Sequence, residues 1–407
     1  TAVNATNLGG GNLAITGGLS QTGVTVLGAT LAGSVGAIDL TSSAQNAGNI
    51  GVNGGTTVDI TSTGQGVGTI TVGNAAVPSG ITTINAAGSY ADGGNNTLGA
   101  INVTGGPSVS ITQTDGVSAA ARAASVADPT NFTQTSSAVT VQGDAATTSV
   151  SVVQPTIATA ANAVAGAGGV IGITGGAVTI TDANSGSAAT DTITTATLTH
   201  YGNSTIDSTV LNTLTLTGGA AASGTLGLNR TTADTTGTAT TLGLNLGGGG
   251  FGAITGTHAA EFTTVNVAAS GGANVLANFT GAAVRALNVS GDQNLTMTAA
   301  ALLANVTSVN VTNTGSTTFG TTTLNNASSF TGAGGAESVI IGATTSAINT
   351  GDGNDTVTLT GAALGVGGSI DAGDGLADGL GMTSANAATA SATGAFELTV
   401  SNFEQLS

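Results

Sequence analysis

The sequence predicts an all-β protein with a right-handed, elongated parallel β-solenoid fold. Three observations support this prediction. Short strands alternate apolar and polar residues, they recur at a step of about 20 residues, and residues typical of turns separate them. The coils of such a fold enclose a narrow core, which suits a chain with only 2% aromatic residues and many small aliphatic ones.

In residues 1–115 the strand pattern starts early and is regular. The strands expected there span residues 38–40, 50–52, 58–60, 70–72, 101–103 and 109–111. The first and third begin 20 residues apart, and so do the second and fourth. This spacing predicts two strands per coil, with each strand stacked on the equivalent strand of the next coil.

Residues 116–135 interrupt this pattern. An Ala-rich stretch around Arg122 predicts a short helix, and Pro129 follows it, so we expect an inserted loop or projection. Strands resume in a second solenoid segment, residues 136–246, at 139–141, 150–152, 178–180 and 214–216. The four glycines 247–250 then form a plausible hinge before a further segment.

Residues 247–330 have a step of 22 residues. Three strands, 265–267, 287–289 and 309–311, each read apolar-Asn-apolar. We expect Asn266, Asn288 and Asn310 to lie on one line, where stacked side-chain amides can hydrogen-bond along a ladder. The Ala/Leu stretch 299–304 predicts a helical turn on the opposite side of the coil.

Residues 350–359, Thr-Gly-Asp-Gly-Asn-Asp-Thr-Val-Thr-Leu, predict a turn followed by a strand. Glycines allow the positive φ angles that turn carbonyl oxygens inward, and Asp355 adds a carboxylate. The stretch matches the nonapeptide G-G-x-G-x-D-x-U-x of calcium β-rolls, with Thr350 in place of the first glycine. Calcium tolerates such irregular oxygen geometry better than magnesium does. The candidate calcium ligands are Gly351, Asp352, Gly353, Asn354 and Asp355.

Two degenerate copies flank this turn, and each has one extra residue. The upstream copy, 332–340, carries Glu in place of Asp, and the downstream copy spans 373–378. Their first glycines lie 19 residues before and 22 residues after Gly351, close to the roughly 18 residues of a β-roll coil. We therefore expect residues 331–407 to stack these turns on one side, with ions between adjacent turns. Ordinary Gly-rich turns without metal are the alternative. The further candidate ligands are Gly332, Gly334, Glu337, Gly373, Asp374, Gly375 and Asp378.

The charge composition also favours a cation partner. The chain has 20 acidic residues and no lysine, and its three basic residues are Arg122, Arg230 and Arg285, so its net charge is −17. Nucleic-acid binding and attraction to anionic membranes need basic residues and are excluded as classes. Without cations, so acidic a chain would repel itself when folded.

Cysteine is absent, which excludes disulfides, zinc–thiolate sites and iron–sulfur clusters. No apolar run approaches the roughly 20 residues of a transmembrane helix. The first four residues are Thr-Ala-Val-Asn, and the last twelve stop in what reads as a strand. We therefore expect an excised middle portion of a longer protein, with anchoring and export signals outside it.

The remaining acidic residues lie beside predicted turns. Asp182, Asp207 and Asp292 are candidates for additional calcium ligands, as are Asp191, Asp234 and Glu261. The competing interpretation is that Asp bonds its own backbone in turns.

No pattern of catalytic residues accompanies these acids. The two imidazoles, His200 and His258, lack a neighbouring acid and nucleophile, so we expect surface or turn histidines. The chain has neither a G-x-S-x-G elbow nor the lysine of a phosphate-binding loop, and we expect no enzyme activity.

Several stretches resemble a known family. Residues 177–182, 205–208, 287–292 and 338–357 are similar, in the same order, to the type I-secreted, calcium-dependent surface-layer (S-layer) proteins of the RTX/Caulobacter type. The similarity covers roughly residues 100–380. It implies an extracellular lattice subunit that assembles with itself when calcium is bound, with hexamers as one form. It also implies a lipopolysaccharide-binding N-terminal region and a C-terminal secretion signal, both outside this chain.

The family's calcium turns map onto two stretches of this sequence. They correspond to Gly351, Gly353 and Asp355, and to Gly373, Asp374, Gly375 and Asp378. The extra residue in the second turn departs from the family pattern.

The sequence thus favours a structural S-layer subunit that is folded and assembled by calcium. A large RTX-type repeat adhesin, which attaches cells to surfaces or to one another, is the alternative. A secreted enzyme with a β-roll would need a catalytic domain outside this portion.

Overall fold

The computed structural model describes residues 13–16, 21–25, 29–34, 36–43, 48–88, 95–114, 133–155, 172–218, 223–229, 239–256, 262–392 and 394–407. These residues fold almost entirely into parallel β-strands and form two compact units, Thr1–Leu211 with Gly218–Gly237, and Asn212–Thr217 with Thr238–Ser407. The helix expected within 116–135 lies outside the described residues. Residues 133–135 belong to a strand, β12 (Thr133–Ser136).

In the first unit two parallel sheets alternate along the chain. One contains β1 (Leu13–Thr16), β3 (Ala29–Ser34), β5 (Ile50–Gly54), β7 (Ile70–Val72), β10 (Ile101–Thr104), β13 (Val139–Gln142), β16 (Val178–Thr181), β18 (Ser204–Asp207) and β20 (Leu226–Asn229). The other contains β2 (Gln21–Thr25), β4 (Ile38–Ser43), β6 (Val58–Gln65), β8 (Thr82–Gly88), β11 (Ser108–Thr114), β14 (Ser149–Val153) and β17 (Thr195–Thr199). A third, short sheet joins β12 to β9 (Asn95–Leu98) and β15 (Gly172–Thr174).

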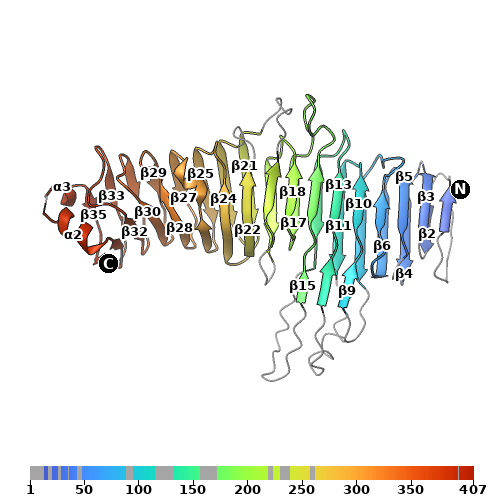
Figure 1. Cartoon of the computed structure of the whole chain (residues 1–407), viewed down its shortest axis with the longest axis horizontal. Coiled ribbons are helices and arrows are strands. Elements are labelled where there is room, and N and C mark those ends of the chain that lie inside the picture. The colour runs from blue at the N-terminus through green and yellow to red at the C-terminus, as the bar shows by residue number, and fades with distance from the viewer. Residues whose placement is uncertain are drawn as a thin grey trace, which may run out of the picture. The chain divides into compact units, whose positions relative to one another are not determined.

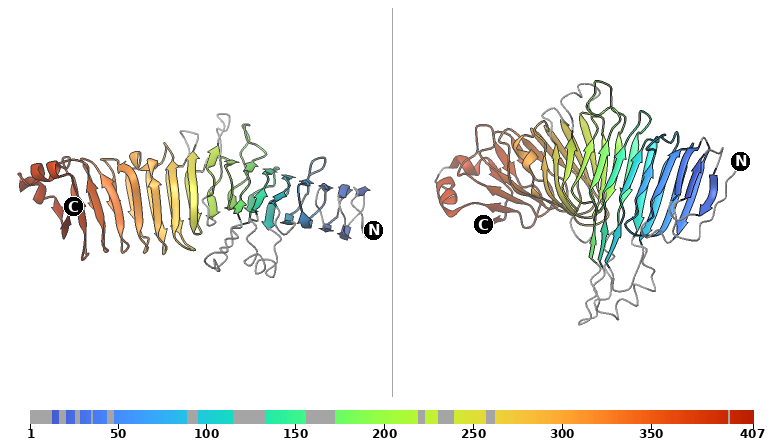
Figure 2. Two further views of the ribbon diagram at one scale, coloured as in Figure 1. Left: turned by 60° about the horizontal axis from the view of Figure 1, so that its bottom comes forward. Right: turned by 45° about the vertical axis from the view of Figure 1, so that its right-hand side comes forward.

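The second unit repeats the same two-sheet plan. One sheet contains β19 (Thr213–Thr217), β21 (Thr241–Leu246), β23 (Thr264–Ala269), β25 (Ala286–Gly291), β27 (Ser308–Val311), β29 (Ser329–Thr331), β31 (Ala347–Asn349), β33 (Ser369–Asp371) and β35 (Val400–Ser401). The other contains β22 (Gly249–Gly256), β24 (Asn274–Thr280), β26 (Leu295–Ala299), β28 (Thr317–Leu324), β30 (Glu337–Ile341), β32 (Thr356–Leu359), β34 (Gly379–Gly381) and β36 (Gln405–Leu406). In Figures 1 and 2 the strands of each unit lie side by side in consecutive coils.

The parallel β-solenoid predicted from the sequence is confirmed within each unit. Ile38 pairs with Val58, and Ile50 pairs with Ile70, as their 20-residue step indicated. Alternation with a period of two places one face of each strand inside the coil, as the burial of β5 and β6 shows. Parallel stacking therefore aligns the aliphatic side chains of successive coils in continuous buried columns.

The predicted asparagine ladder of the second unit is also confirmed. Asn266, Asn288 and Asn310 are aligned residue for residue across β23, β25 and β27. The Nδ2 group of Asn288 donates to Oδ1 of Asn266 at 2.8 Å. This amide contact adds a side-chain hydrogen bond to the backbone bonds between the two coils.

Asparagines at the corners connect coils in a second way. The side-chain Oδ1 of Asn49 accepts the backbone N–H of Thr69 in the next coil at 2.9 Å, and Asn203 does the same for Thr225 at 3.0 Å. Backbone N–H groups at the corners therefore have hydrogen-bond acceptors even where they lie outside the strand pairing.

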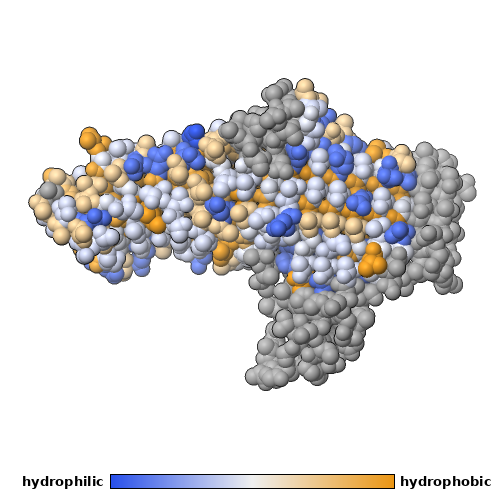
Figure 3. Space-filling model, viewed as in Figure 1, coloured by the Kyte–Doolittle hydropathy of each residue, from blue (hydrophilic) through white to orange (hydrophobic). Residues whose placement is uncertain are grey.

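Buried aromatic residues contribute to the core of the second unit. Phe319 of β28 and Phe330 of β29 are each 1% exposed, and their rings meet edge to face with centroids 6.2 Å apart. This contact joins the two sheets across the core of one coil. On the face drawn in Figure 3, orange patches are small and are interspersed with pale and blue residues.

Three local expectations have definite outcomes. The helical turn predicted at 299–304 is present as a 3₁₀ helix, η1 (Ala301–Ala304). The glycine run 247–250, predicted as a hinge, joins β21 to the start of β22 inside the second unit, with positive φ at Gly248 and Gly249. The stretch 396–407 is not one strand, because α3 (Gly394–Glu397) precedes the two-residue strands β35 and β36. The other α-helix, α2 (Ser384–Ala390), is capped by Thr383.

Candidate cation-binding turns

The three glycine-rich turns of the second unit stack on one side of the solenoid, as predicted. Glu337 is the first residue of β30, and Asp355 and Asp378 immediately precede β32 and β34. Because Ser338 pairs with Thr356, and Thr356 pairs with Gly379, the three acids occupy one column in successive coils. Parallel pairing thus brings together residues that lie 18 and 23 positions apart in the sequence.

Glycine is required in these turns by the closeness of the neighbouring coil. Gly351 and Gly353 have φ angles of +91° and +131°, which L side chains rarely adopt. A methyl group on Gly353 would also collide with the carbonyl oxygen of Gly335, and one on Gly373 with that of Gly351. Only a chain without Cβ atoms at these positions can bring the turns this close together.

Backbone hydrogen bonds hold the turns in register. The N–H of Asp374 donates to the carbonyl oxygen of Gly351, and that of Gly353 donates to the oxygen of Asp374, both at 3.1 Å. Asp352 and Asp374 thereby form an isolated parallel bridge. The turns are extensions of the sheet and not independent surface loops.

A directional series of hydrogen bonds joins the acids. Oδ1 of Asp355 accepts the backbone N–H of Glu337 at 2.7 Å, and Oδ1 of Asp378 accepts that of Asp355 at 2.7 Å. Oε2 of Glu404 accepts the N–H of Asp378 at 2.8 Å. Each carboxylate therefore points toward the preceding coil. We call these four residues the acid ladder.

The coils of the acid ladder also contain buried carboxylate oxygens that lack a hydrogen-bond partner. We call the space between the turns of two successive coils an interval. Glu337, Asp355 and Asp378 are at most 1% exposed. Oδ2 of Asp355, Oδ2 of Asp378 and both carboxylate oxygens of Glu337 have no hydrogen-bond donor. A buried carboxylate without a positive partner is strongly unfavourable. Arg285, the one arginine among the described residues, donates instead to the backbone carbonyls of Ala282 and Val284.

The pKa values of the three buried acids of the ladder are raised above their ordinary values. Burial raises the pKa of Glu337 to about 8, and the neighbouring Asp355 carboxylate adds to the rise. Burial likewise raises the pKa of Asp355 to about 6, although the hydrogen bond from the Glu337 amide opposes it. The pKa of Asp378 is also raised, chiefly by burial. A bound cation would reverse these shifts by favouring the charged forms.

The oxygens of each interval suit a hard cation. A Cβ atom on Gly375 would contact both carboxylate oxygens of Asp378 and the carbonyl oxygen of Gly353, so these three oxygens lie close together. Gly353 in turn faces the carbonyl oxygen of Gly335 and Oδ1 of Asp355. Carboxylate and carbonyl oxygens in irregular arrangement are the ligands that calcium prefers. Within the described part of the chain no three acidic or imidazole side chains converge on one point, so carbonyls would have to complete any site.

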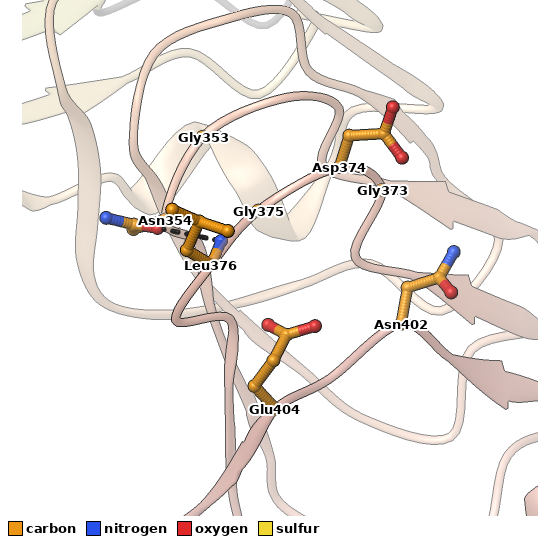
Figure 4. Close-up of a pocket in the computed structure, with 8 residues that line it drawn as sticks. All are labelled: Gly353, Asn354, Gly373, Asp374, Gly375, Leu376, Asn402 and Glu404. Atoms are coloured by element: carbon orange, nitrogen blue, oxygen red, sulfur yellow. Dashed lines mark hydrogen bonds between the residues drawn. The ribbon is translucent and has the colours of Figure 1, made fainter.

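Several predicted ligands have side chains outside the ladder. Asp352, Asn354 and Asp374 are exposed, and Gly334 has open space around it. Oδ1 of Asn354 accepts the N–H of Leu376 at 3.2 Å, which makes it a turn-stabilising residue. In Figure 4 the carboxylate of Asp374 points away from that of Glu404. Asp352 and Asp374 thus contribute to the turns through their backbone and add negative charge at the surface.

Glu404 was not predicted from the sequence, and it extends the ladder by one coil. It is exposed and lines an open hollow of about 590 Å³ with residues of the two preceding turns (Figure 4). No glycine-rich motif marks it. The available signal was the register, because Gln405 pairs with Gly379 and so places Glu404 in the column of Asp378.

The acids of the first unit support the competing interpretation of turn stabilisation. Oδ2 of Asp182 accepts the N–H groups of Thr192 and Ile193, both at 2.7 Å, and Oδ1 accepts that of Asn184 at 3.1 Å. Asp191 accepts the N–H of Thr209 at 2.6 Å. These carboxylates therefore organise the loop between β16 and β17 of the first unit.

The other proposed ligands are more scattered. Asp207 accepts the hydroxyl of Ser185 at 2.7 Å, and Asp292, in the second unit, is exposed and accepts the amide of Gln293 at 3.3 Å. Asp234 and Glu261 lie outside the described residues. His200, expected as a surface or turn histidine, adopts a positive φ where the chain bends after β17. It is 3% exposed and contacts the Pro155 carbonyl. His258 lies outside the described residues.

The fold and these turns define a parallel β-solenoid whose last coils carry a column of buried acids. No protein-family model and no characterised protein matched this chain in the comparisons made. None of the helices in the described ranges is both long and apolar enough to cross a bilayer.

Proposed function

We propose that this chain is a structural subunit of an extracellular, two-dimensional S-layer lattice that calcium folds and assembles. The acid ladder carries the proposal, because its buried carboxylate oxygens have no donor and no basic residue in the described ranges supplies the cation that they need. Calcium would be held by Asp355 and Asp378 together with the carbonyl oxygens of Gly335 and Gly353. The bound ion would supply positive charge between adjacent coils.

The physical mechanism is linkage between ion binding and folding. Without calcium the buried carboxylate oxygens have no positive partner, which weakens the last coils. With millimolar calcium each ion stabilises the folded form by an amount that grows with its concentration relative to Kd. Low calcium inside a cell would keep the chain exportable, and higher calcium outside would fold it.

The net charge of the chain means that self-association would require cations. With a net charge of −17, adjacent subunits would repel one another, so divalent cations would also be needed between them. Attachment to lipopolysaccharide would depend on a region outside this chain. The asparagine ladder and the regular coils would give each subunit the rigidity that a lattice requires.

Two measurements test the proposal. Circular dichroism during a chelator titration should show loss of β-structure that calcium restores, and electron microscopy of calcium-treated protein should show sheets. Unchanged structure and assembly without calcium would defeat the proposal. Isolated rods without sheets would instead support the large RTX-type adhesin, which shares the coils and the ion requirement.

A further inference from the structure

The interval before Glu337 differs from the others in the acid ladder. Glu337 is paired in register with Thr317, which begins β28 in the preceding coil. The turn that leads into Thr317, residues 312–316, contains Asn313 and Gly315 but no acidic residue and no glycine–aspartate motif. The sequence pattern marks Glu337 as a candidate ligand, but it gives no reason to expect an ion between the turn 312–316 and the turn that precedes Glu337.

The carboxylate of Glu337 lacks even the one hydrogen bond that its ladder neighbours have. In the two following intervals, one carboxylate oxygen accepts a backbone N–H from the preceding coil. Here the equivalent N–H, that of Thr317, donates to the carbonyl oxygen of Ala336 at 2.9 Å. Both oxygens of Glu337 are consequently buried without a donor.

Other oxygens gather around the same carboxylate. Gly335 is buried, and the point where a Cβ atom would stand on it lies 3.0 Å from Oε1 of Glu337 and 2.8 Å from the carbonyl oxygen of Asn313. The carbonyl oxygen of Gly315 also contacts this point. One carboxylate oxygen and two backbone oxygens therefore surround the glycine.

Asn313 contributes a further unused oxygen. Its side chain is fully buried, and its Nδ2 group donates to the carbonyl oxygens of Gln293 at 2.9 Å and Gly315 at 3.1 Å. These bonds fix the orientation of the amide. The Oδ1 atom has no donor within the described structure. A buried amide oxygen without a donor is unfavourable, as is the buried Glu337 carboxylate.

We propose that a calcium ion binds between the turn 312–316 and the turn 332–336, with Glu337 as its only charged ligand. The neutral ligands are the carbonyl oxygens of Asn313 and Gly315 and Oδ1 of Asn313. This inference rests on the proposed function in that it takes calcium as the ion of the whole ladder. It adds an interval whose preceding turn is outside the nonapeptide pattern, so the motif alone understates the number of ions.

Ion counting with a matched pair of variants tests this site. Glu337→Gln removes the charge and keeps the shape, and Glu397→Gln makes the same change on an exposed residue of α3. Native mass spectrometry of the full chain in calcium should find one ion fewer for Glu337→Gln than for wild type, and no loss for Glu397→Gln. In chelator at pH 8 the Glu337→Gln protein should unfold at a temperature at or above that of wild type, since a buried charge is gone.

The outcomes separate this inference from the proposed function. An unchanged ion count in folded Glu337→Gln, with one ion lost in Asp378→Asn, would overturn the site at Glu337 alone. A wild-type protein that binds no calcium would overturn both. Crystals of wild type soaked in terbium provide a measurement that needs no variant. An anomalous peak about 2.3–2.6 Å from a Glu337 oxygen is expected, and a peak only at Asp378 would refute the inference.

Discussion

Replacing Asp355 by asparagine separates the two roles of its side chain. Oδ1 accepts the Glu337 N–H at 2.7 Å, and the asparagine oxygen can keep that bond. Oδ2 is buried without a donor, and the substitution puts an uncharged NH₂ group there. The variant therefore tests the charge and leaves the hydrogen bond between coils in place.

The size of the effect follows from the pKa of the acid and from ion binding. Burial raises the pKa of Asp355 from 3.8 to about 6. At pH 8 Asp355 is charged in both states, and its charged form is less favourable in the folded state than in the unfolded state. At roughly 1.4 kcal/mol per pKa unit, this charge costs up to about 3 kcal/mol in chelator, and Asp355→Asn should be more stable by up to that amount. With calcium at about 1,000 times its Kd, wild type gains about 4.1 kcal/mol that the variant loses.

The sign of the stability difference should therefore reverse on adding calcium. Thermal and urea unfolding of both proteins at pH 8, in chelator and in millimolar calcium, measures it. The control is Asp352→Asn, whose carboxylate is exposed, and it should change stability by less than about 0.5 kcal/mol in either buffer. A difference of the same sign in both buffers would refute the assignment of Asp355 as a cation ligand.

Three further predictions follow from contacts in the second unit. In chelator, raising the pH from about 4.5 to about 8 should lower the unfolding temperature. Burial raises the pKa of Glu337 to about 8, so over this range the folded state holds a proton that the unfolded state releases. An unfolding temperature that does not change with pH would contradict this. Phe330→Ala should cost about 3–5 kcal/mol in urea unfolding, since it leaves a cavity against Phe319, and a cost below about 1 kcal/mol would indicate a looser core. Asn288→Ala should cost only about 1 kcal/mol, since its bond to Asn266 is exposed, and a loss several times larger would mean that the ladder is cooperative.

Much of the fold could be predicted because two periods coincide in the sequence. Alternation by two residues marks a strand, and a constant step between equivalent residues fixes the register, as for Asn266 and Asn288. The prediction weakened where coils carry long loops. Ser108 pairs with Ser149, 41 positions further on, so no constant step was visible there. The third sheet was missed because β9 and β12 are short and mostly polar.

The candidate site was only partly predictable for a related reason. Asp355 and Asp378 follow glycine-rich turns, so a local motif marks them. Glu404 joins the same column through strand pairing alone, and Asn313 lies in the turn before Thr317, the pairing partner of Glu337. Nothing in the immediate sequence of either residue distinguishes it. Asp182 shows the converse case, in which the right residue type beside a turn is fully occupied by backbone amides.

The hydrogen bonds of the acid ladder all run in one direction, which makes the last coils asymmetric. Each coil supplies the acceptor that completes the coil before it, so no coil in this series is complete until the following one has been added. Removal of residues 399–407 would take away Glu404 and leave the amide of Asp378 without its acceptor. Loss of this end would therefore leave an earlier amide without its carboxylate acceptor, whereas loss of the first coil of the series would remove no acid-ladder acceptor from the later coils.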